Sequence, residues 1–543
     1  MRKNPFALVP VVLAFLTISG CGSPEQTGTE KIPEDSSPAF GDAVVEGVVS
    51  DALGLQPYGS TDAATTRVTS RIYQGLVKLD RNCEPVPDLA ETWEISADGK
   101  TITFRLKQGI LWHDGEEFTA KDAFFTYSNQ LFYIAQFVET LEMLDNYSVR
   151  FHYQMPFAPA LRQFAQPVIP EHVFKTHDNI YAPEYKNKAI GTGPYRFKQW
   201  RSGEELVLEA SENYFEGRPY IQEYVFRVIP DPSTAFLALL RGELDILYIT
   251  PDQYAKQVDN KNFRTQYNLI RYPSPSRITW IGYNSRGPFF NDLRVRRAMT
   301  MALDREAIIK EAFRGCASIT DGPWPKNSWA YNSTMEILPY SPEKARLLVS
   351  EAGWKDLDGD GILEKDGRKF DCRIIFITGN KALELTAWMA SSFWKEIGIK
   401  VSLKACDMQT LLTSRHHEDF DILLDEIGLP DPDLYYYFHW FESPIPGAKG
   451  GRNCVGYKND EVSDLCQKGR TTLDREERIR IYHRLHELIY NDQPYTFLCS
   501  PDNLVAVSNR FRGVEASPAG IFHNYTRWYV PKQQQKYSID RNQ

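Results

Sequence analysis

The sequence predicts an α/β fold made of more than one domain. Stretches typical of strands alternate with stretches typical of helices along the chain, which favours mixed layers over an all-helical or all-strand body. The chain has 543 residues, too many for one hydrophobic core, so two or three domains are expected. Its composition, 42% hydrophobic and 13% aromatic, is that of an ordinary globular protein.

The first twenty residues have the pattern of a secretory signal peptide. Arg2 and Lys3 form a basic start, and residues 6–18 form an apolar run shorter than the about 20 residues that a bilayer requires. The run ends in Ile-Ser-Gly-Cys at 18–21, which resembles a bacterial lipobox. We therefore expect cleavage after residue 20 and lipid modification of Cys21. An ordinary signal peptide followed by a chance cysteine is the alternative.

Residues 21–42 are rich in Glu, Thr, Ser, Pro and Gly. Such a composition buries too little apolar surface to fold by itself. We expect a flexible tether that holds the folded body at a membrane, where two or more acyl chains on Cys21 would anchor it stably.

Three segments further along show clear local patterns. Residues 101–106 alternate apolar and polar side chains, which predicts a strand. Ser-Pro at 341–342 and a glycine at 353 mark the two ends of a predicted helix that runs through residue 349. Asp474 begins a longer helix, in which apolar residues recur from position 481 with the spacing of a core-facing stripe.

Charge and cysteine content exclude two classes of protein. The formal net charge is −9, and −11 without Arg2 and Lys3, which argues against binding to nucleic acid. Seven cysteines besides Cys21 leave at least one free thiol, and none of them forms a CxxC motif for redox chemistry or zinc. Scattered buried thiols are favoured over a disulfide framework.

The sequence contains no complete catalytic motif, so we expect neither an enzyme nor a cofactor. GxSxG is absent, and the HExxH pattern begun by His486 and Glu487 has Tyr490 where the second histidine should stand. Gly-Thr-Gly at 191–193 lacks the rest of a phosphate-binding loop. The polar run 416–419 (His-His-Glu-Asp) is typical of a solvated loop more than of a metal site.

One acidic segment has part of the spacing of a calcium loop. The matching residues are Asp356, Asp358, Asp360, Gly361 and Glu364, at loop positions 1, 3, 5, 6 and 9. Position 12, which should be a bidentate Glu, is Gly367. The segment is either a residual calcium site or a polar turn between a helix and a strand, and we favour the turn.

Several longer motifs occur in a recognisable order. They are residues 72–76 (IYQGL), 88–93 (DLAETW), 109–122 (GILWHDGEEFTAKD), 191–195 (GTGPY), 213–215 (NYF), 218–220 (RPY), 293–297 (LRVRR), 302–305 (ALDR), 340–354 and 493–495 (QPY). With these motifs the chain resembles the family 5 bacterial extracellular solute-binding proteins, which include oligopeptide- and dipeptide-binding proteins.

The resemblance implies a periplasmic binding protein-like fold of type II, with two lobes on a two-strand hinge and an inserted subdomain. The implied parts are a discontinuous first lobe (43–80, 186–284 and 500–535), the subdomain (81–185) and a second lobe (285–499), with strands crossing near 283–284 and 498–501. Two lobes on such a hinge close around a ligand, because each contributes part of the pocket wall.

The implied function is that of the binding lipoprotein of an ABC importer. It would capture peptides, above all oligopeptides, outside the cytoplasmic membrane and deliver them as a monomer to the permease and ATPase. An oligosaccharide or a metal chelate is an alternative ligand. A receptor-coupled or chaperone-like binding module is an alternative role.

The resemblance places ligand contacts in three segments, residues 56–62, 280–284 and 424–440. The candidate residues in them are Tyr58, Asp62, Trp280, Tyr283, Asn284, Asp425, Glu426, Gly428, Asp431 and Trp440. Aromatic rings suit such clefts because they bury ligand area at little entropic cost. Each of these aromatic residues has an alternative place in the core of a lobe.

The loop after residue 424 departs from the pattern of dipeptide binders. Those proteins carry an amine-binding Asp four residues before the loop proline, and that position, counted from Pro432, is Gly428. They also carry a carboxylate-binding Arg where this chain has Glu384 or Leu385. We therefore expect weak binding of free dipeptides, since a buried charge without a partner is costly, unless a neighbouring acidic residue replaces the Asp.

Overall fold

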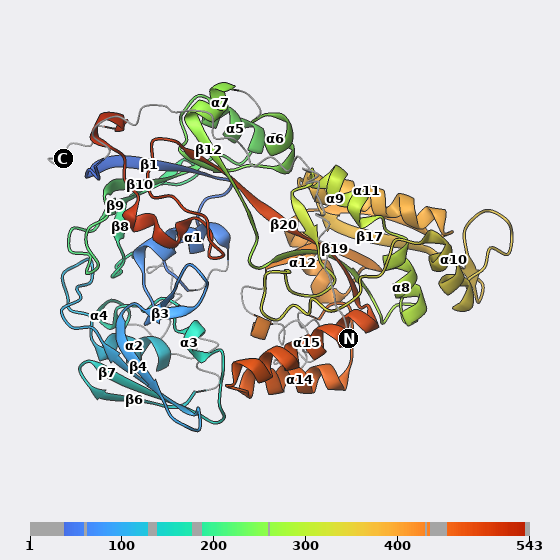
Figure 1. The fold of residues 1–543 in the computed structure, drawn as a ribbon, viewed down its shortest axis with the longest axis horizontal. Helices are drawn as coiled ribbons and strands as arrows, with labels where there is room; N and C mark the ends of the chain where they lie inside the picture. The colour runs from blue at the N-terminus through green and yellow to red at the C-terminus, as the bar shows by residue number, and fades with distance from the viewer. Residues whose placement is uncertain are drawn as a thin grey trace, which may run out of the picture. The chain divides into compact units, whose positions relative to one another are not determined.

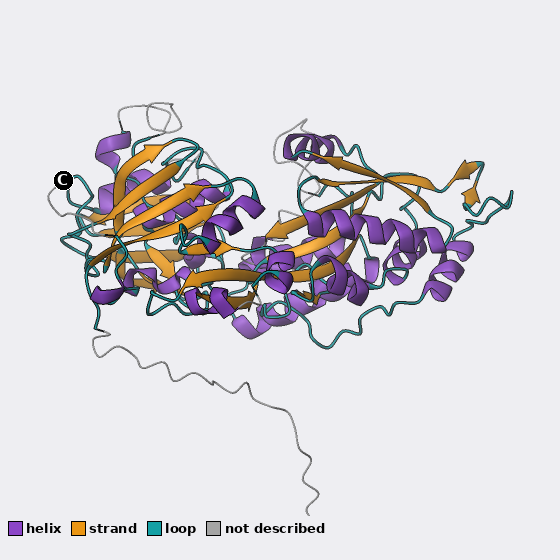
Figure 2. Ribbon diagram, turned by 90° about the horizontal axis from the view of Figure 1, so that it is seen from above, coloured by secondary structure: helices purple, strands orange, loops and turns teal. Residues whose placement is uncertain are grey.

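The computed structural model describes residues 37–58, 62–128, 138–175, 187–258, 261–428, 432–434 and 453–537. Cys21, the predicted signal peptide and most of the predicted tether lie outside these residues. The first strand starts at Gly41, within the last residues of the predicted tether. Strands gather in two groups, with helices against each group (Figure 2).

The first group of strands includes both ends of the described chain. Its strands are β1 (Gly41–Val48), β8 (Tyr195–Arg201), β9 (Glu205–Ala210), β10 (Ile221–Val228), β11 (Ile246–Tyr248), β12 (Tyr267–Pro273) and the second half of β20 (Tyr495–Ser508); its helices are α1 (Ala63–Ile72), α5 (Pro232–Leu240), α6 (Pro251–Lys256), α7 (Lys261–Gln266), η4 (Phe522–Arg527) and η5 (Lys532–Gln534). Val44 and Val45 point to opposite faces of β1, because side chains alternate along a strand. They enter two different hydrophobic cores, so both faces of this sheet are covered.

A smaller unit with its own core follows α1. Its strands are β2 (Val77–Leu79), β3 (Pro85–Pro87), β4 (Ala90–Ile95), β5 (Thr101–Leu106), β6 (Val138–Asp145) and β7 (Ser148–Tyr153), and its helices are α2 (Ala120–Ser128), α3 (Ala160–Gln163) and α4 (Glu171–Phe174). The four longer strands form an antiparallel sheet in the order β4-β5-β7-β6. Phe104, Phe151 and Phe164 pack edge-on at its centre, with ring centroids 4.6–5.9 Å apart. The strand predicted at 101–106 is confirmed as β5.

The second group of strands has the order β18-β17-β19-β13-β20. Its strands are β13 (Arg277–Tyr283), β14 (Ala317–Ile319), β17 (Asp371–Ile377), β18 (Lys400–Cys406), β19 (Ile422–Gly428) and the first half of β20, with a hairpin of β15 (Glu364–Lys365) and β16 (Arg368–Lys369) beside them. Its helices are α8 (Leu293–Met301), α9 (Arg305–Ala312), α10 (Pro342–Glu351), α11 (Lys381–Glu396), α12 (Met408–His417), η3 (Pro432–Leu434), α14 (Asp460–Thr471) and α15 (Arg475–Asp492). Two separate cores cover its two faces.

Helices α10 and α15 confirm the two predicted helices. Ser341 caps α10 by accepting a hydrogen bond from the backbone N–H of Lys344, and Gly353 follows the helix with a φ of +93°. Asp474 caps α15 through the N–H of Glu477. Of the predicted stripe, Ile481, Leu485 and Ile489 are buried and Leu488 is packed against the same core.

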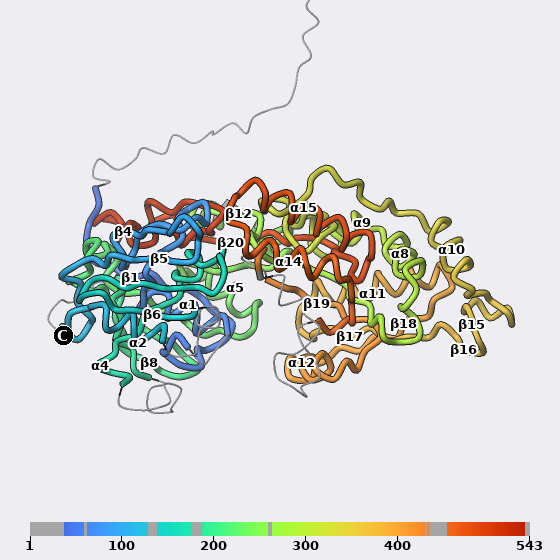
Figure 3. Tube along the Cα trace, turned by 90° about the horizontal axis from the view of Figure 1, so that it is seen from below, coloured from blue at the N-terminus to red at the C-terminus, as the bar shows by residue number. Residues whose placement is uncertain are grey.

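The chain crosses between the two groups at two places. Cys499 in β20 pairs with Thr279 on one edge and Ile319 on the other, whereas Val505 pairs with Ile270 and Tyr248 of the first group. β20 therefore runs from one group to the other (Figure 1), and β12 lies beside it (Figure 3). The other crossing is the short link 274–276 between β12 and β13.

This link corrects one expectation about the hinge. The resemblance places a crossing strand near Tyr283, but β13 pairs with β19 along its whole length, from Arg277 to Tyr283. Ile281 and Tyr283 are buried in a core of the second group, so the strand belongs to that group from its start. The crossing accordingly lies several residues earlier in the chain.

Candidate ligand-binding site at the strand crossing

A cavity of about 340 Å³ lies where the two strand groups meet. Its lining residues come from the β12–β13 link, from β13, from the end of β19 and from β20, and are Ser274, Pro275, Ser276, Arg277, Glu426, Ile427, Gly428 and Asn503. The link is shaped by Ser274, whose Oγ accepts the backbone N–H of Arg277 at 3.0 Å. Two of the predicted candidates, Glu426 and Gly428, therefore line one cavity.

The register of β13 and β19 explains which side chains reach the cavity. Arg277 lies opposite Gly428, and Thr279 lies opposite Glu426, so these four residues share one face of the sheet. Further along the same face, the side chains of β13 and β19 enter a buried core. Gly428 leaves space beside Arg277, since a Cβ placed there would have Ser276 Oγ at 3.9 Å as its nearest neighbour.

The cavity is lined by one acidic and one basic side chain, those of Glu426 and Arg277. Glu426 Oε1 accepts a hydrogen bond from the Thr279 hydroxyl at 3.0 Å, and Arg277 Nη2 donates to the backbone carbonyl of Asp502 at 3.2 Å. The Nε of Arg277 is buried and has no hydrogen-bond partner among the described residues. Across the same residues, neither Glu426 nor Arg277 forms an ion pair. Both side chains therefore keep bonding capacity for a ligand.

Asp425 and Asp433 are acidic residues of the same loop that the fold uses internally. Asp425 points to the other face of β19 and pairs with Arg415 at 2.9 Å; burial raises the pKa of Asp425, and Arg415 opposes that rise. Asp433 is buried and accepts from Arg478 and Tyr482 of α15. Because strand side chains alternate, Asp425 points away from Glu426 and Gly428, and its ligand contact stays a prediction.

Trp280 and Tyr283 of β13, and Asn284 just after it, also have structural contacts. Trp280 is 4% exposed and packs edge-on against Tyr495 at 5.1 Å in one core. Tyr283 is fully buried in the other core, where its hydroxyl lies 2.6 Å from Thr496 Oγ1. Asn284 ends the strand by donating to two backbone carbonyls, those of residues 418 and 420. Both faces of β13 are covered by cores, so these side chains have structural contacts, and their ligand contacts stay a prediction.

The candidates near α1 have internal roles as well. Asp62 is the N-cap of α1 and accepts the N–H of Thr65 at 2.8 Å. The Tyr58 hydroxyl donates to the carbonyl of Pro167, and its ring packs against the cores of the first group and of the smaller unit. Asp431 and Trp440 lie outside the described residues.

Arg277, Ser274 and Asn503 are among the cavity residues that the sequence did not predict. The segment Ser-Pro-Ser-Arg at 274–277 stands between two strand-like runs, and proline flanked by serines is a signal for a turn. That signal marks the end of β12 but does not reveal that Arg277 faces Gly428, more than a hundred residues away.

In the acidic segment with calcium-loop spacing, a lysine side chain lies among the carboxylates. Ligand oxygens of Asp356, Asp358, Asp360 and Glu364 lie within 4.8 Å of one another. Lys369 Nζ lies 2.9 Å from Asp358 and 3.5 Å from Glu364, and also bonds Asp360. Its ammonium group thus occupies the place between the carboxylates, which favours the polar turn over a metal site.

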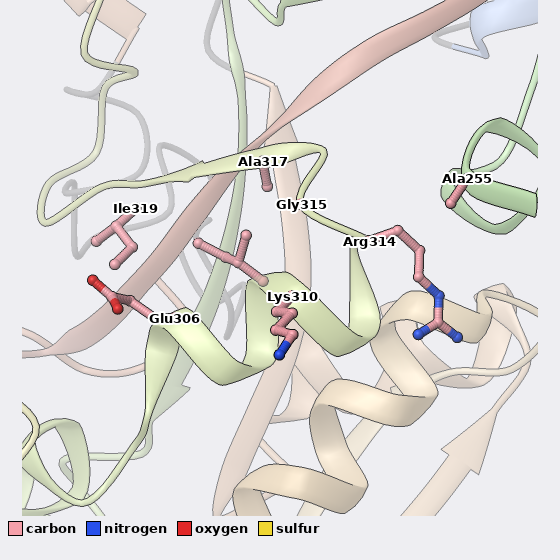
Figure 4. Close-up of a pocket in the computed structure, with 8 residues that line it drawn as sticks. Ala255, Glu306, Lys310, Arg314, Gly315, Ala317 and Ile319 are labelled. Atoms are coloured by element: carbon pink, nitrogen blue, oxygen red, sulfur yellow. The ribbon is translucent and has the colours of Figure 1, made fainter. Parts of the chain in front are cut away.

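A larger cavity, of about 460 Å³, lies on the opposite edge of β20. It is lined by residues of α6, α9 and β14 and of the turn between α9 and β14: Ala255, Glu306, Ile309, Lys310, Arg314, Gly315, Ala317 and Ile319 (Figure 4). Arg314 already pairs with Asp252 of α6 at 2.7 Å. Glu306 and Lys310 of this cavity also form no ion pair among the described residues, so the smaller cavity differs in containing two predicted candidates, Glu426 and Gly428.

Comparison with known proteins identifies the family. The model of the bacterial extracellular solute-binding proteins, family 5, matches residues 84–448. The chain belongs to this family. The family 5 protein is similar to the oligopeptide-binding protein AppA of Bacillus subtilis, with 30% identity over 552 residues that cover 98% of this chain and 99% of AppA.

Solved structures agree with this assignment. The structure of B. subtilis AppA in complex with a nonapeptide has a TM-score of 0.79 and 29% identity, and the match covers 91% of this chain and 100% of that one. NikZ from Campylobacter jejuni, in complex with Ni(L-His), also has a TM-score of 0.79, at 27% identity and with 90% and 99% of the two chains covered. The predicted type II binding-protein fold is confirmed.

Family membership also settles the broad activity. Members of this family are substrate-binding proteins of transporters, so the family 5 protein is not an enzyme. No helix in the described part of the chain is long and apolar enough to cross a membrane.

Proposed function

We propose that this family 5 protein is the peptide-binding component of an ABC importer. In this role it captures peptides outside the cytoplasmic membrane and delivers them to the permease and ATPase. The observation that carries the proposal is the cavity at the strand crossing, whose lining comes from both strand groups and contains an uncommitted carboxylate and guanidinium. The relatives named above, an oligopeptide-binding protein and a nonapeptide complex, support peptides as the ligand class.

Delivery by hinge closure follows from the connections between the strand groups. Within the described chain, the first group passes into the second through the link 274–276, and β20 returns to the first. Two short crossings allow one group to rotate against the other, and closure would bury a ligand held between them. A monomer is sufficient for this mechanism, since one chain supplies the whole cavity.

The ligand class is tested by identifying what the purified protein carries. Small molecules released by denaturation would be analysed by mass spectrometry, and the melting temperature of the emptied protein would be measured with added peptides, since a ligand of the native state raises it. Peptides in the released fraction and a peptide-dependent rise are expected. A released oligosaccharide, or a metal chelate such as the one bound by NikZ, would contradict the peptide assignment.

A lipid anchor at Cys21 is part of the same proposal. Ile-Ser-Gly-Cys at 18–21 supports it, and acyl chains there would keep the protein on the outer face of the membrane. Cys21→Ala should leave the protein unprocessed or release it from the membrane fraction. An unmodified, soluble wild-type protein with an intact Cys21 would contradict the anchor.

A further inference from the structure

The smaller unit touches the second strand group at a place outside the strand crossing. On the second group the contact surface is the α14–α15 corner, residues 467–475, and on the smaller unit it is the turn at 96–99 together with residues 84 and 155–158. The corner is fixed to the second group by the core that α14 and α15 share with its sheet. The smaller unit is fixed to α1 of the first group through residues 191–193. The contact therefore joins the two strand groups a second time, besides the strands that cross between them.

One part of this contact is a backbone hydrogen bond. The N–H of Ala158 donates to the carbonyl of Arg470 at 2.7 Å. Arg470 belongs to the last turn of α14, where backbone carbonyls lack a partner within the helix. The smaller unit thus supplies a donor to the end of this helix, and water can take its place when the two surfaces separate.

An apolar contact and an ion pair accompany this bond. Leu473, in the turn between α14 and α15, packs directly on Gly99, because a Cβ at Gly99 would collide with the Cδ1 atom of the leucine. Arg475 Nη2 lies 3.8 Å from Glu84 Oε1, and both of these side chains are about half exposed. Leu473 itself is 46% exposed, and exposed ion pairs contribute little to stability. The contact can therefore break without opening either hydrophobic core.

We propose that the smaller unit is a clasp, which closes on the α14–α15 corner when the two strand groups close over a peptide. The contact residues are not among those that line the candidate cavity, so the clasp stabilises the closed form through contacts within the protein. Apparent affinity rises with the fraction of the protein that is in the binding-competent form. The clasp therefore raises the affinity for every peptide by one common factor and leaves the order of preference unchanged. This inference rests on the proposed function and gives the smaller unit a role in it.

The first test compares the hydrogen exchange of two backbone amides in the emptied, full-length protein. The N–H of Ala158 takes part in the clasp, whereas the N–H of Tyr153 bonds the carbonyl of Lys100 inside the smaller unit at 2.7 Å. Relative to their intrinsic rates, we expect Ala158 to exchange at least tenfold faster than Tyr153, because the clasp opens while the smaller unit stays folded. Equal protection of the two amides would indicate a fixed joint and overturn the clasp.

The second test adds a mixed-sequence pentapeptide library with free N-termini to the same protein. Binding of the library should slow the exchange of Ala158 at least fivefold and leave that of Tyr153 unchanged. Unchanged exchange at Ala158 in a protein that calorimetry shows to be loaded would overturn the clasp but leave the peptide function standing. A library that does not bind would overturn the peptide function, and the two amides of the emptied protein would then decide about the clasp alone.

Variants separate the clasp from the cavity. Leu473→Asp should weaken the binding of the library three- to tenfold, and native mass spectrometry should find the bound peptides in unchanged relative amounts. Leu347→Asp, a matched change of an exposed leucine on α10 of the second group, should stay within twofold of the wild type. Wild-type affinity in Leu473→Asp, or a changed order of preference among the bound peptides, would contradict the proposal.

Discussion

At the residue scale, one buried carboxyl group makes the stability of the protein depend on pH. Asp88 is 3% exposed, accepts a hydrogen bond from Gln74 at 2.7 Å and lies 3.9 Å from Lys78 Nζ. Burial raises the pKa of Asp88 to about 7, although Lys78 acts in the opposite direction. The native state therefore holds a proton at pH values where the unfolded chain has lost it.

We predict that Asp88→Asn stabilises the protein above pH 7. Between the unfolded pKa of about 4 and the native value, the native state binds more protons, so stability falls as pH rises and stays lower above pH 7. At about 1.4 kcal/mol per pKa unit, the asparagine removes a penalty on the order of 4 kcal/mol at pH 8 and little at pH 4. Urea unfolding of both proteins at the two pH values measures this. A gain at pH 4 alone would contradict it.

Substitution of Tyr283 distinguishes a role in the hydrophobic core from a role in ligand binding. Tyr283→Phe removes the hydroxyl that lies 2.6 Å from Thr496, while Thr300 still bonds Thr496. We expect a loss of about 1 kcal/mol in unfolding free energy, the usual contribution of one buried hydrogen bond, and peptide affinity within twofold of the wild type. Urea unfolding and calorimetry measure the two quantities. A large loss of affinity in a protein of normal stability would return Tyr283 to the binding site.

At the scale of elements, three of the recognised motifs, 72–76, 109–122 and 191–195, meet at the end of α1. The carbonyl of Gly191 accepts the backbone N–H of His113 at 2.9 Å, and the N–H of Gly193 bonds the carbonyl of Ile72 at 2.8 Å. His113 Nε2 lies 2.9 Å from the Gly193 carbonyl. The glycines of residues 191–193 thus join α1 to the smaller unit, a structural role rather than a phosphate-binding one.

This junction predicts opposite results for two Gly-to-Ala changes. A Cβ at Gly191 would lie 1.8 Å from the Ile72 carbonyl oxygen, whereas one at Gly428 would have 3.9 Å to its nearest neighbour. Gly191→Ala should cost about 3 kcal/mol of stability, as severe overpacking does. Gly428→Ala should stay within about 0.5 kcal/mol. Urea unfolding followed by tryptophan fluorescence compares them, and equal midpoints would contradict the packing argument.

At the scale of the whole molecule, the crossing is a paired strand and a short link rather than a loose linker. Up to Pro501, β20 pairs with β13 on one edge and β14 on the other; after Pro501 it pairs with β12 and β11. Asp502 pairs with Arg271 of β12 at 2.6 Å, and Arg314 pairs with Asp252 across the other edge. Motion between the strand groups is therefore expected at residues 274–276 and 500–502, with the groups themselves moving as rigid bodies.

We predict that ligand binding compacts the protein. Small-angle X-ray scattering of the emptied protein should show a smaller radius of gyration once a mixed-sequence pentapeptide library with free N-termini is added, because a ligand that contacts both groups favours the closed form. Glu426→Gln, with the same library, should show a smaller change. Scattering that stays constant while calorimetry proves binding would contradict hinge closure.

The sequence by itself determined the α/β class, the strand at Thr101–Leu106, the helices α10 and α15, and the family. These conclusions rest on local signals, namely side-chain periodicity, Ser341 and Asp474 as caps, and motifs in a fixed order. Such signals are complete within a few residues of the chain, so no partner distant in the sequence is needed to read them.

Only the tertiary structure decided which candidates line a cavity. Trp280, Tyr283 and Asp425 have the residue types of a binding site, but β13 and β19 are covered on both faces along most of their length. Arg277 became a candidate because the register sets it opposite Gly428. Whether a strand residue meets a core or a cavity depends on what packs on that face, and here those partners come from segments up to about two hundred residues away.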